Sequence, residues 1–164
     1  MSAEIRNTAT RQAIPANSVD VRGPRFAAWI TTAVLVVVLI TAAFSTAAAA
    51  VLIAIQAVVF AIGSATGPRR SPYGRIYAAL VAPRVGPPTE TEPAEPLRFA
   101  QLLGLIFSAV SLLGFLAGAS VVGAVFAGFA LFAAFLNAAF GICLGCRIYP
   151  LVTRFRRTPA PASN

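Results

Sequence analysis

Two cysteines, Cys143 and Cys146, are the only thiols of the chain, and they lie three positions apart near the end of its last long apolar stretch. Two thiols at this spacing can close a disulfide, share a metal ion or carry sulfur. The chain has no histidine and five acidic residues, which excludes a Ser-His-Asp triad or a Cys-His pair. A structural zinc ion needs four ligands, and only two chains together would supply four thiolates, so we predict no metal site. The catalytic hypothesis is therefore thiol chemistry at this pair.

The neighbours of the two cysteines favour and oppose a reactive thiolate. If the last apolar helix continues through the motif, residues three apart share one of its faces. Arg147 is adjacent, and Arg75 would join it if the two halves of the chain pack symmetrically; positive charge lowers the pKa of a cysteine. The negative end of a helix dipole has the opposite effect. Gly141 and Gly145 loosen the helix enough to permit a disulfide. The alternative is that both cysteines are small apolar residues of a membrane helix.

Asn137 is the only amide in the predicted fourth span, residues 121–141, and lies two turns before the motif. An interhelical hydrogen bond, worth about 0.6 kcal/mol, is its simplest role. Its alternative role is to orient a thiol or a ligand beside the cysteine pair.

Long charge-free stretches must position these residues. The chain is 58% hydrophobic with a mean hydropathy of +0.80, and residues 26–68 and 99–146 carry no charge. As helix, each stretch is roughly 65–70 Å long, which crosses a hydrocarbon core of about 30 Å twice. We therefore predict an all-α integral membrane protein with four transmembrane helices in two tandem hairpins. The predicted spans are 26–44, 47–63, 99–118 and 121–141.

Arginines predict the orientation. All basic residues are arginine, and they lie before, between and after the two hairpins. The positive-inside rule places these three segments, and with them both termini, in the cytoplasm. The net charge of +8 then reflects topology and attraction to membrane lipid, and we predict no nucleic-acid binding. Arginine without lysine, among many alanines and glycines, suggests a GC-rich bacterium and hence a multi-pass protein of the plasma (inner) membrane.

The polar segments divide the chain. We predict a disordered polar tail over residues 1–18, a membrane domain over 19–152, and a basic then disordered tail over 153–164. Residues 64–98 are rich in proline and predict a cytoplasmic linker. Helical spacing of apolar residues 76–81 predicts one short interfacial helix within it.

An internal repeat relates the two hairpins. Arg25-Phe26-Ala27 opens the first and Arg98-Phe99-Ala100 the second, while Gly74-Arg75-Ile76-Tyr77 follows the first and Cys146-Arg147-Ile148-Tyr149 the second. We predict a duplication with a pseudo-two-fold axis along the membrane normal; the alternative is chance similarity of arginine-flanked apolar segments. The first half lacks the thiols, so only the second half can do their chemistry.

Five motifs between residues 19 and 149 are the most distinctive: Asp20-Val21-Arg22-Gly23-Pro24-Arg25-Phe26, Ser71-Pro72-Tyr73-Gly74, Pro83-Arg84-Val85-Gly86-Pro87-Pro88, Arg98-Phe99-Ala100-Gln101 and Asn137-Ala138-Ala139-Phe140-Gly141-Ile142-Cys143-Leu144-Gly145-Cys146. In these motifs the chain resembles an actinobacterial membrane family, the domain of unknown function DUF4395, marked by Gly-x-Cys-Leu-Gly-Cys. Members of that family accompany thioredoxin-like and sulfurtransferase proteins, so the resemblance implies a role in thiol or sulfur handling.

These features predict a cytoplasm-facing thiol-redox or sulfur-relay protein that works with a soluble thioredoxin-like or sulfurtransferase partner. One alternative is a transporter of a small sulfur species, and another is a scaffold that docks a partner through residues 69–98. The sequence does not decide whether the chain is an enzyme; thiol–disulfide oxidoreductase activity is the enzymatic option. No cofactor is evident. A quinone is an option that nothing in the sequence supports, and a homo-oligomer stays open.

Overall fold

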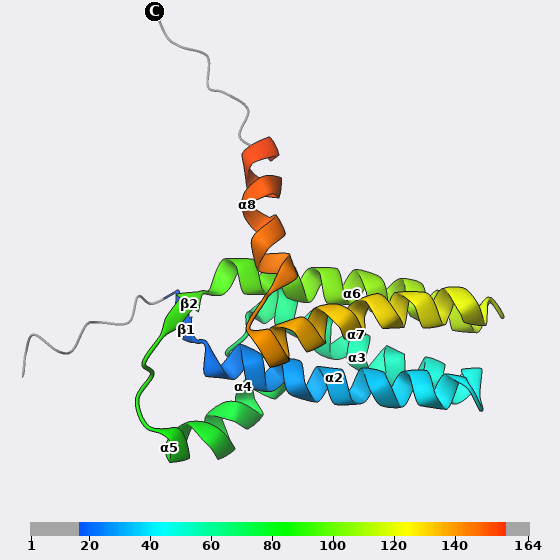
Figure 1. Cartoon of the computed structure of the whole chain (residues 1–164), viewed down its shortest axis with the longest axis horizontal. Helices are drawn as coiled ribbons and strands as arrows, with labels where there is room; N and C mark the ends of the chain where they lie inside the picture. The colour runs from blue at the N-terminus through cyan, green and yellow to red at the C-terminus, as the bar shows by residue number, and fades with distance from the viewer. Residues whose placement is uncertain (1–16, 157–164) are drawn as a thin grey trace, which may run out of the picture.

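The structure is a computed structural model that describes residues 17–156 (Figure 1). Its framework consists of four long helices: α2 (Arg22–Ala42), α3 (Thr46–Thr66), α6 (Ala94–Leu116) and α7 (Ser120–Phe140). Each is long and apolar enough to cross a membrane. The predicted fold class, an all-α membrane protein with four transmembrane helices in two hairpins, is therefore confirmed. The orientation of the termini stays a prediction.

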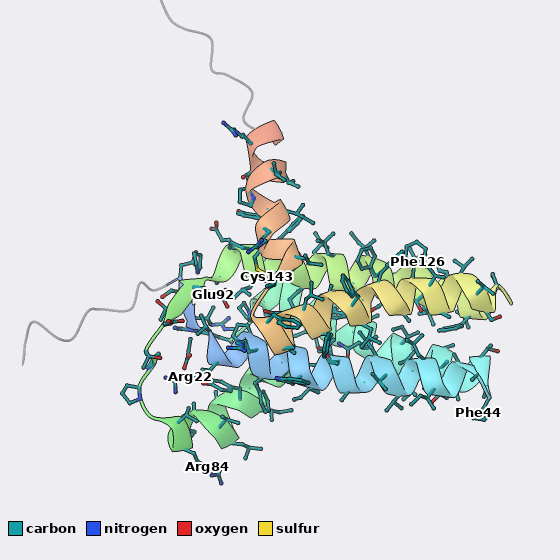
Figure 2. The ribbon with its side chains drawn as sticks, in the orientation of Figure 1. Arg22, Phe44, Arg84, Glu92, Phe126 and Cys143 are labelled. Atoms are coloured by element: carbon teal, nitrogen blue, oxygen red, sulfur yellow. A yellow bond between two sulfur atoms is a disulfide. The ribbon has the colours of Figure 1, made fainter. Side chains whose placement is uncertain are left out.

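The two hairpins pack side by side into one bundle. The most extensive contacts join α3 to α6 and α2 to α7, and each helix also contacts its own hairpin partner. Leu35, Val38, Ile53, Phe115 and Ala127 are buried in the shared core. Large apolar side chains such as Phe44 are exposed on the outside (Figure 2). An apolar exterior of this extent is what lipid contact requires.

Two hairpin turns are closed by local chemistry. Ser45 accepts a hydrogen bond from the Ala48 N–H at 3.2 Å, which caps the start of α3. At the other turn, a Cβ on Gly114 would lie 2.6 Å from the Gly123 nitrogen. The absence of a side chain at Gly114 thus lets α6 and α7 approach closely next to their turn.

Two spans begin earlier than predicted. α2 starts at Arg22 and α6 at Ala94, four and five residues before the predicted starts at 26 and 99. Both helices carry a proline in the first turn, Pro24 and Pro96, where the missing N–H needs no helical partner. The charged first turns extend the helices beyond the charge-free stretches from which the spans were predicted.

The segment between the hairpins is more ordered than the predicted linker. It contains α4 (Pro72–Ile76), the π-helical turn η1 (Tyr77–Val81), α5 (Ala82–Val85) and β2 (Thr91–Pro93). β2 pairs antiparallel with β1 (Ser18–Asp20), with Val19 opposite Glu92. The short helix predicted at residues 76–81 lies within the helical run, whereas the strand pair was not predicted. β1 also begins inside the predicted disordered tail, and the rest of that tail, residues 1–16, lies outside the described residues.

Hydrogen bonds fasten this segment to the start of the bundle. The Arg22 guanidinium donates to the carbonyl oxygens of Val85 at 2.9 Å and Pro87 at 2.7 Å. The Tyr77 hydroxyl donates to the Asp20 carboxylate at 3.0 Å; burial and this carboxylate raise the pKa of Tyr77. Burial also raises the pKa of Glu92. The segment therefore closes over the polar end of the bundle.

The last element, α8 (Leu144–Arg156), leaves the bundle at a steep angle to its long axis (Figure 1). It extends past residue 153, where a basic tail was predicted to begin; residues 157–164 of that tail lie outside the described part. Its exposed residues include apolar Ile148 and Leu151 as well as basic Arg147 and Arg154. A helix of this composition, set across a membrane bundle, suits the membrane–water interface.

Candidate functional site

Gly141 ends α7 before the cysteine motif. Its backbone is left-handed, with φ of 68°, and its N–H donates to the Asn137 carbonyl at 3.1 Å. The Ile142 N–H donates to the Leu136 carbonyl at 3.2 Å, and together these bonds form a helix C-cap that favours glycine. α7 therefore ends next to the predicted end of the fourth span at residue 141, and no continuous helix carries both cysteines.

Cys143 instead caps the start of the next helix. The Cys146 N–H donates to the Cys143 sulfur at 3.2 Å, and the Arg147 N–H donates to the Cys143 carbonyl at 3.1 Å. Cys143 thus occupies the N-cap of α8, where free N–H groups and the positive end of the helix dipole favour an anion. The sequence predicts that the negative end of a helix dipole disfavours a thiolate here. The structure instead places the positive end of the α8 dipole at Cys143, which favours a thiolate.

The two sulfur atoms of Cys143 and Cys146 lie at disulfide distance, and the Cα atoms are 5.2 Å apart. This Cα separation is within the usual disulfide range. Both residues are half-buried. Figure 2 shows Cys143 where the chain passes from α7 into α8, beside α6.

Gly145 seats the start of α8 on α6. A Cβ on Gly145 would lie 2.7 Å from the Ala100 Cβ and 2.6 Å from its Cα, so only glycine fits. One turn further, the Tyr149 ring packs on Phe99 at 5.8 Å between centroids, and its hydroxyl donates to Glu95 at 3.3 Å. These contacts hold the cysteine-bearing turn against the bundle.

Of the remaining predicted site residues, Asn137 and Arg147 lie near the cysteine pair and Arg75 does not. Asn137 lies on α7 and lines a cavity together with Cys143. Arg147 follows the pair on α8 with its side chain exposed. Arg75 is exposed on α4, which packs on α2 and α3, so the structure does not bring it to the cysteines.

Arg25 is a neighbour of the site that sequence reasoning missed. Its guanidinium donates to the Ala138 carbonyl at 3.5 Å, and its Cζ would lie 4.0 Å from a Cβ on Gly141. A cation thus stands at the C-terminal end of α7, close to the connection that carries Cys143. Its position directly before the first predicted span was visible in the sequence, but no feature there links Arg25 to the end of the fourth span.

A cavity of about 620 Å³ extends from the cysteine motif between the helices. Its walls are mainly apolar and include Phe60 and Phe107, while Thr31, Gln101 and Asn137 add uncharged polar groups. The sequence offered no signal for this cavity beyond isolated polar residues in apolar helices.

Fold and site together define a four-helix membrane protein with a cysteine pair at the N-terminus of a crosswise helix. The model of the family described as Domain of unknown function (DUF4395) matches residues 19–154, so the chain belongs to this family. No curated protein and no solved structure matches the chain.

Proposed function

We propose that this membrane protein exchanges disulfides through Cys143 and Cys146 with a soluble thioredoxin-like or sulfurtransferase partner in the cytoplasm. The observation that carries the proposal is the position of Cys143 as the N-cap of α8, with the Cys146 N–H on its sulfur. A helix N-terminus stabilises a thiolate, which is the reactive form of cysteine. Burial of an inert cysteine needs no such position.

The geometry supports an order of events. Cys143 lines the internal cavity, and Cys146 lies one turn along α8. A thiolate of the partner attacks the Cys146 sulfur, forms a mixed disulfide and releases Cys143 as the thiolate, which the helix N-terminus stabilises as leaving group. The second thiolate of the partner then attacks the partner's first sulfur, which is bonded to Cys146 in the mixed disulfide. This attack releases Cys146 as a thiolate. The partner ends as a disulfide, and the pair ends as a dithiol after taking up two protons.

The internal repeat, which we also propose, explains why one half carries the chemistry. Ser71 caps α4 and accepts a hydrogen bond from the Gly74 N–H at 3.1 Å. Cys143 caps α8 and accepts one from the Cys146 N–H at 3.2 Å. The sequence alignment pairs these same residues. A hydroxyl in the first half would then correspond to the reactive sulfur in the second.

Two arginines support the same relation. Arg98, at the start of α6, donates to the Ala65 carbonyl near the end of α3 at 2.7 Å. Arg25, at the start of α2, donates to the Ala138 carbonyl near the end of α7. Each hairpin thus offers an arginine to the last turn of the other hairpin, as a two-fold axis requires.

Mass-shift alkylation in intact cells tests the proposed function. We expect the Cys143–Cys146 pair to change reversibly between two thiols and none when cells meet an oxidant and recover. Cys143→Ser leaves Cys146 able to retain the partner in a mixed disulfide, which a non-reducing gel detects and the Cys143→Ser/Cys146→Ser variant lacks. A pair that keeps one redox state under oxidant and reductant alike contradicts the proposal.

A further inference from the structure

The cavity beside Cys143 has the size and position of a small-molecule site. Its volume of about 620 Å³ lies within the range of ligand pockets. Side chains of α2, α6 and α7 line it inside the bundle, and the cysteine-bearing turn of α8 lines it at one end. A molecule at this end of the cavity therefore contacts Cys143.

The polar groups of the cavity suit a neutral molecule with hydrogen-bond acceptors. Thr31, Gln101 and Asn137 reach it from three different helices. Within residues 17–156, none of these side chains makes a hydrogen bond, although only 5% of Thr31 is exposed. These groups have no partner in the described part of the protein, so carbonyl oxygens of a ligand in the cavity would accept hydrogen bonds from them.

Charged lining residues are confined to the polar end of the cavity, where they already have protein partners. Asp20 accepts from Tyr77 and Arg22, and Arg69 donates to the Ser18 carbonyl at 2.7 Å. The spans contribute no charge to the walls. An apolar, uncharged ligand fits these walls better than an ion.

Access from the lipid is available along α7. Phe129 and Phe132 line the cavity, yet 53% and 58% of these residues are exposed on the bundle. These two side chains therefore form the wall between the cavity and the lipid, and their movement would admit an occupant from the bilayer.

We propose that this cavity binds a quinone, which oxidises the Cys143–Cys146 dithiol. A quinone ring is flat, apolar and uncharged, carries two carbonyl acceptors, and dissolves in lipid. The two thiols lose two electrons and two protons and form the S–S bond, and the quinone gains both and becomes the quinol. This inference rests on the proposed thiol–disulfide function, because it names the acceptor that regenerates the disulfide.

The test uses the full chain in phosphatidylcholine nanodiscs, reduced and then freed of reductant. The probe is decylubiquinone, whose substituted ring leaves no position for thiol addition. We expect one quinol for each disulfide closed, followed by absorbance and by thiol alkylation. Ala133→Trp, which fills the cavity, is expected to slow this reaction at least tenfold while exchange with dithiothreitol stays unchanged.

Matched variants separate the outcomes. Val125→Trp adds the same side chain on α7 at a residue that is 46% exposed and outside the cavity, and it should react as the unmodified chain does. Thr31→Val keeps the shape of the side chain, removes its hydroxyl and should weaken quinone binding several-fold. The same loss is expected when Thr31→Val is added to the Cys143→Ser/Cys146→Ser variant, which binds quinone but cannot reduce it. Equal quinone reduction by Ala133→Trp and the unmodified chain overturns the site. If the unmodified chain exchanges disulfides with dithiothreitol but reduces no quinone, the quinone is not the acceptor and the thiol function stands. If the unmodified chain does neither, both the thiol function and this inference are overturned.

Discussion

Cys143 shows how one backbone angle decides the chemistry of a residue. Because Gly141 is left-handed, α7 stops and Cys143 begins a new helix instead of ending an old one. The same sulfur on a continuous helix would face backbone carbonyls and not N–H groups. The sequence shows the spacing of the cysteines, but it does not show whether the positive or the negative end of a helix dipole lies at Cys143.

Unequal reactivity of the two thiols is the first prediction at this scale. In reduced protein, Cys143 in the Cys146→Ser variant should react with iodoacetamide about tenfold faster at pH 7 than Cys146 in the Cys143→Ser variant, because the α8 N-terminus stabilises the Cys143 thiolate. The rate against pH should reach half its maximum at lower pH for Cys143. Identical pH profiles for the two variants would contradict this role of the helix.

Glu92 gives a prediction about pH. Burial raises its pKa above the ordinary value, so the folded state binds this proton more tightly than the unfolded state. The proton on Glu92 therefore stabilises the folded state fully at pH values below the ordinary pKa of glutamate. This stabilisation is lost as the pH rises through the raised pKa. Opening of the β1–β2 pair, measured by hydrogen exchange corrected for intrinsic rates, should become easier over that range.

Glu92→Gln should remove this pH dependence, because an amide does not titrate. Glu90→Gln is the matched control, since Glu90 is exposed just before the strand. A pH dependence that persists in Glu92→Gln would assign the effect to another group.

The seat of α8 on α6 carries the prediction at the scale of elements. Gly145→Ala places a methyl group against Ala100, and overpacking of this kind costs about 1–3 kcal/mol. We expect a lower thermal midpoint in detergent and less disulfide closed at a fixed redox potential, because the cysteine-bearing turn shifts away from the bundle.

Gly128→Ala is the control for this change. It lies in α7, and a Cβ there meets nothing within 4 Å, so the stability should stay the same or rise slightly. Equal losses in both variants would show that α8 is not held by close approach at Gly145.

Elements were predictable where their signal was local. Charge-free stretches located the four spans, and apolar spacing located the helical turn around Tyr77. The β1–β2 pair depends on Val19 meeting Glu92 across the length of the first hairpin, and no short pattern encodes that contact. The end of α7 also had a local signal in Gly141, a residue type typical of helix C-caps, and the predicted fourth span ends at this residue.

The orientation of the whole molecule supplies a further prediction. If the arginine-rich segments face the cytoplasm, a membrane-impermeant maleimide should label reduced Cys146 in inverted vesicles and not in intact spheroplasts. A cysteine introduced at exposed Phe44, in the first hairpin turn, should show the reverse. Labelling of Cys146 from outside would overturn the cytoplasmic placement and the cytoplasmic partner together.

At this scale the sequence predicted the four-helix architecture and the pairing of helices into hairpins, because hydropathy and length determine both. It could not predict the cavity, which arises only where α2, α6 and α7 converge beside Cys143. Cys143, Cys146, Gly141, Gly145 and Asn137 were all named in advance and lie in one region. Their arrangement depends on the turn at Gly141 and on the start of α8, a helix that was not predicted from the sequence.

The extensive contact between hairpins has a consequence for synthesis of the chain. α3 packs on α6 and α2 on α7 more extensively than α2 packs on α3, so the first hairpin enters the bilayer before the surface that completes it has been translated. Cys143 and Cys146 follow all four spans, and the ribosome releases them after the last helix. The thiols thus appear only after all four spans have been made, and no earlier cysteine of this sequence can capture them in a wrong disulfide.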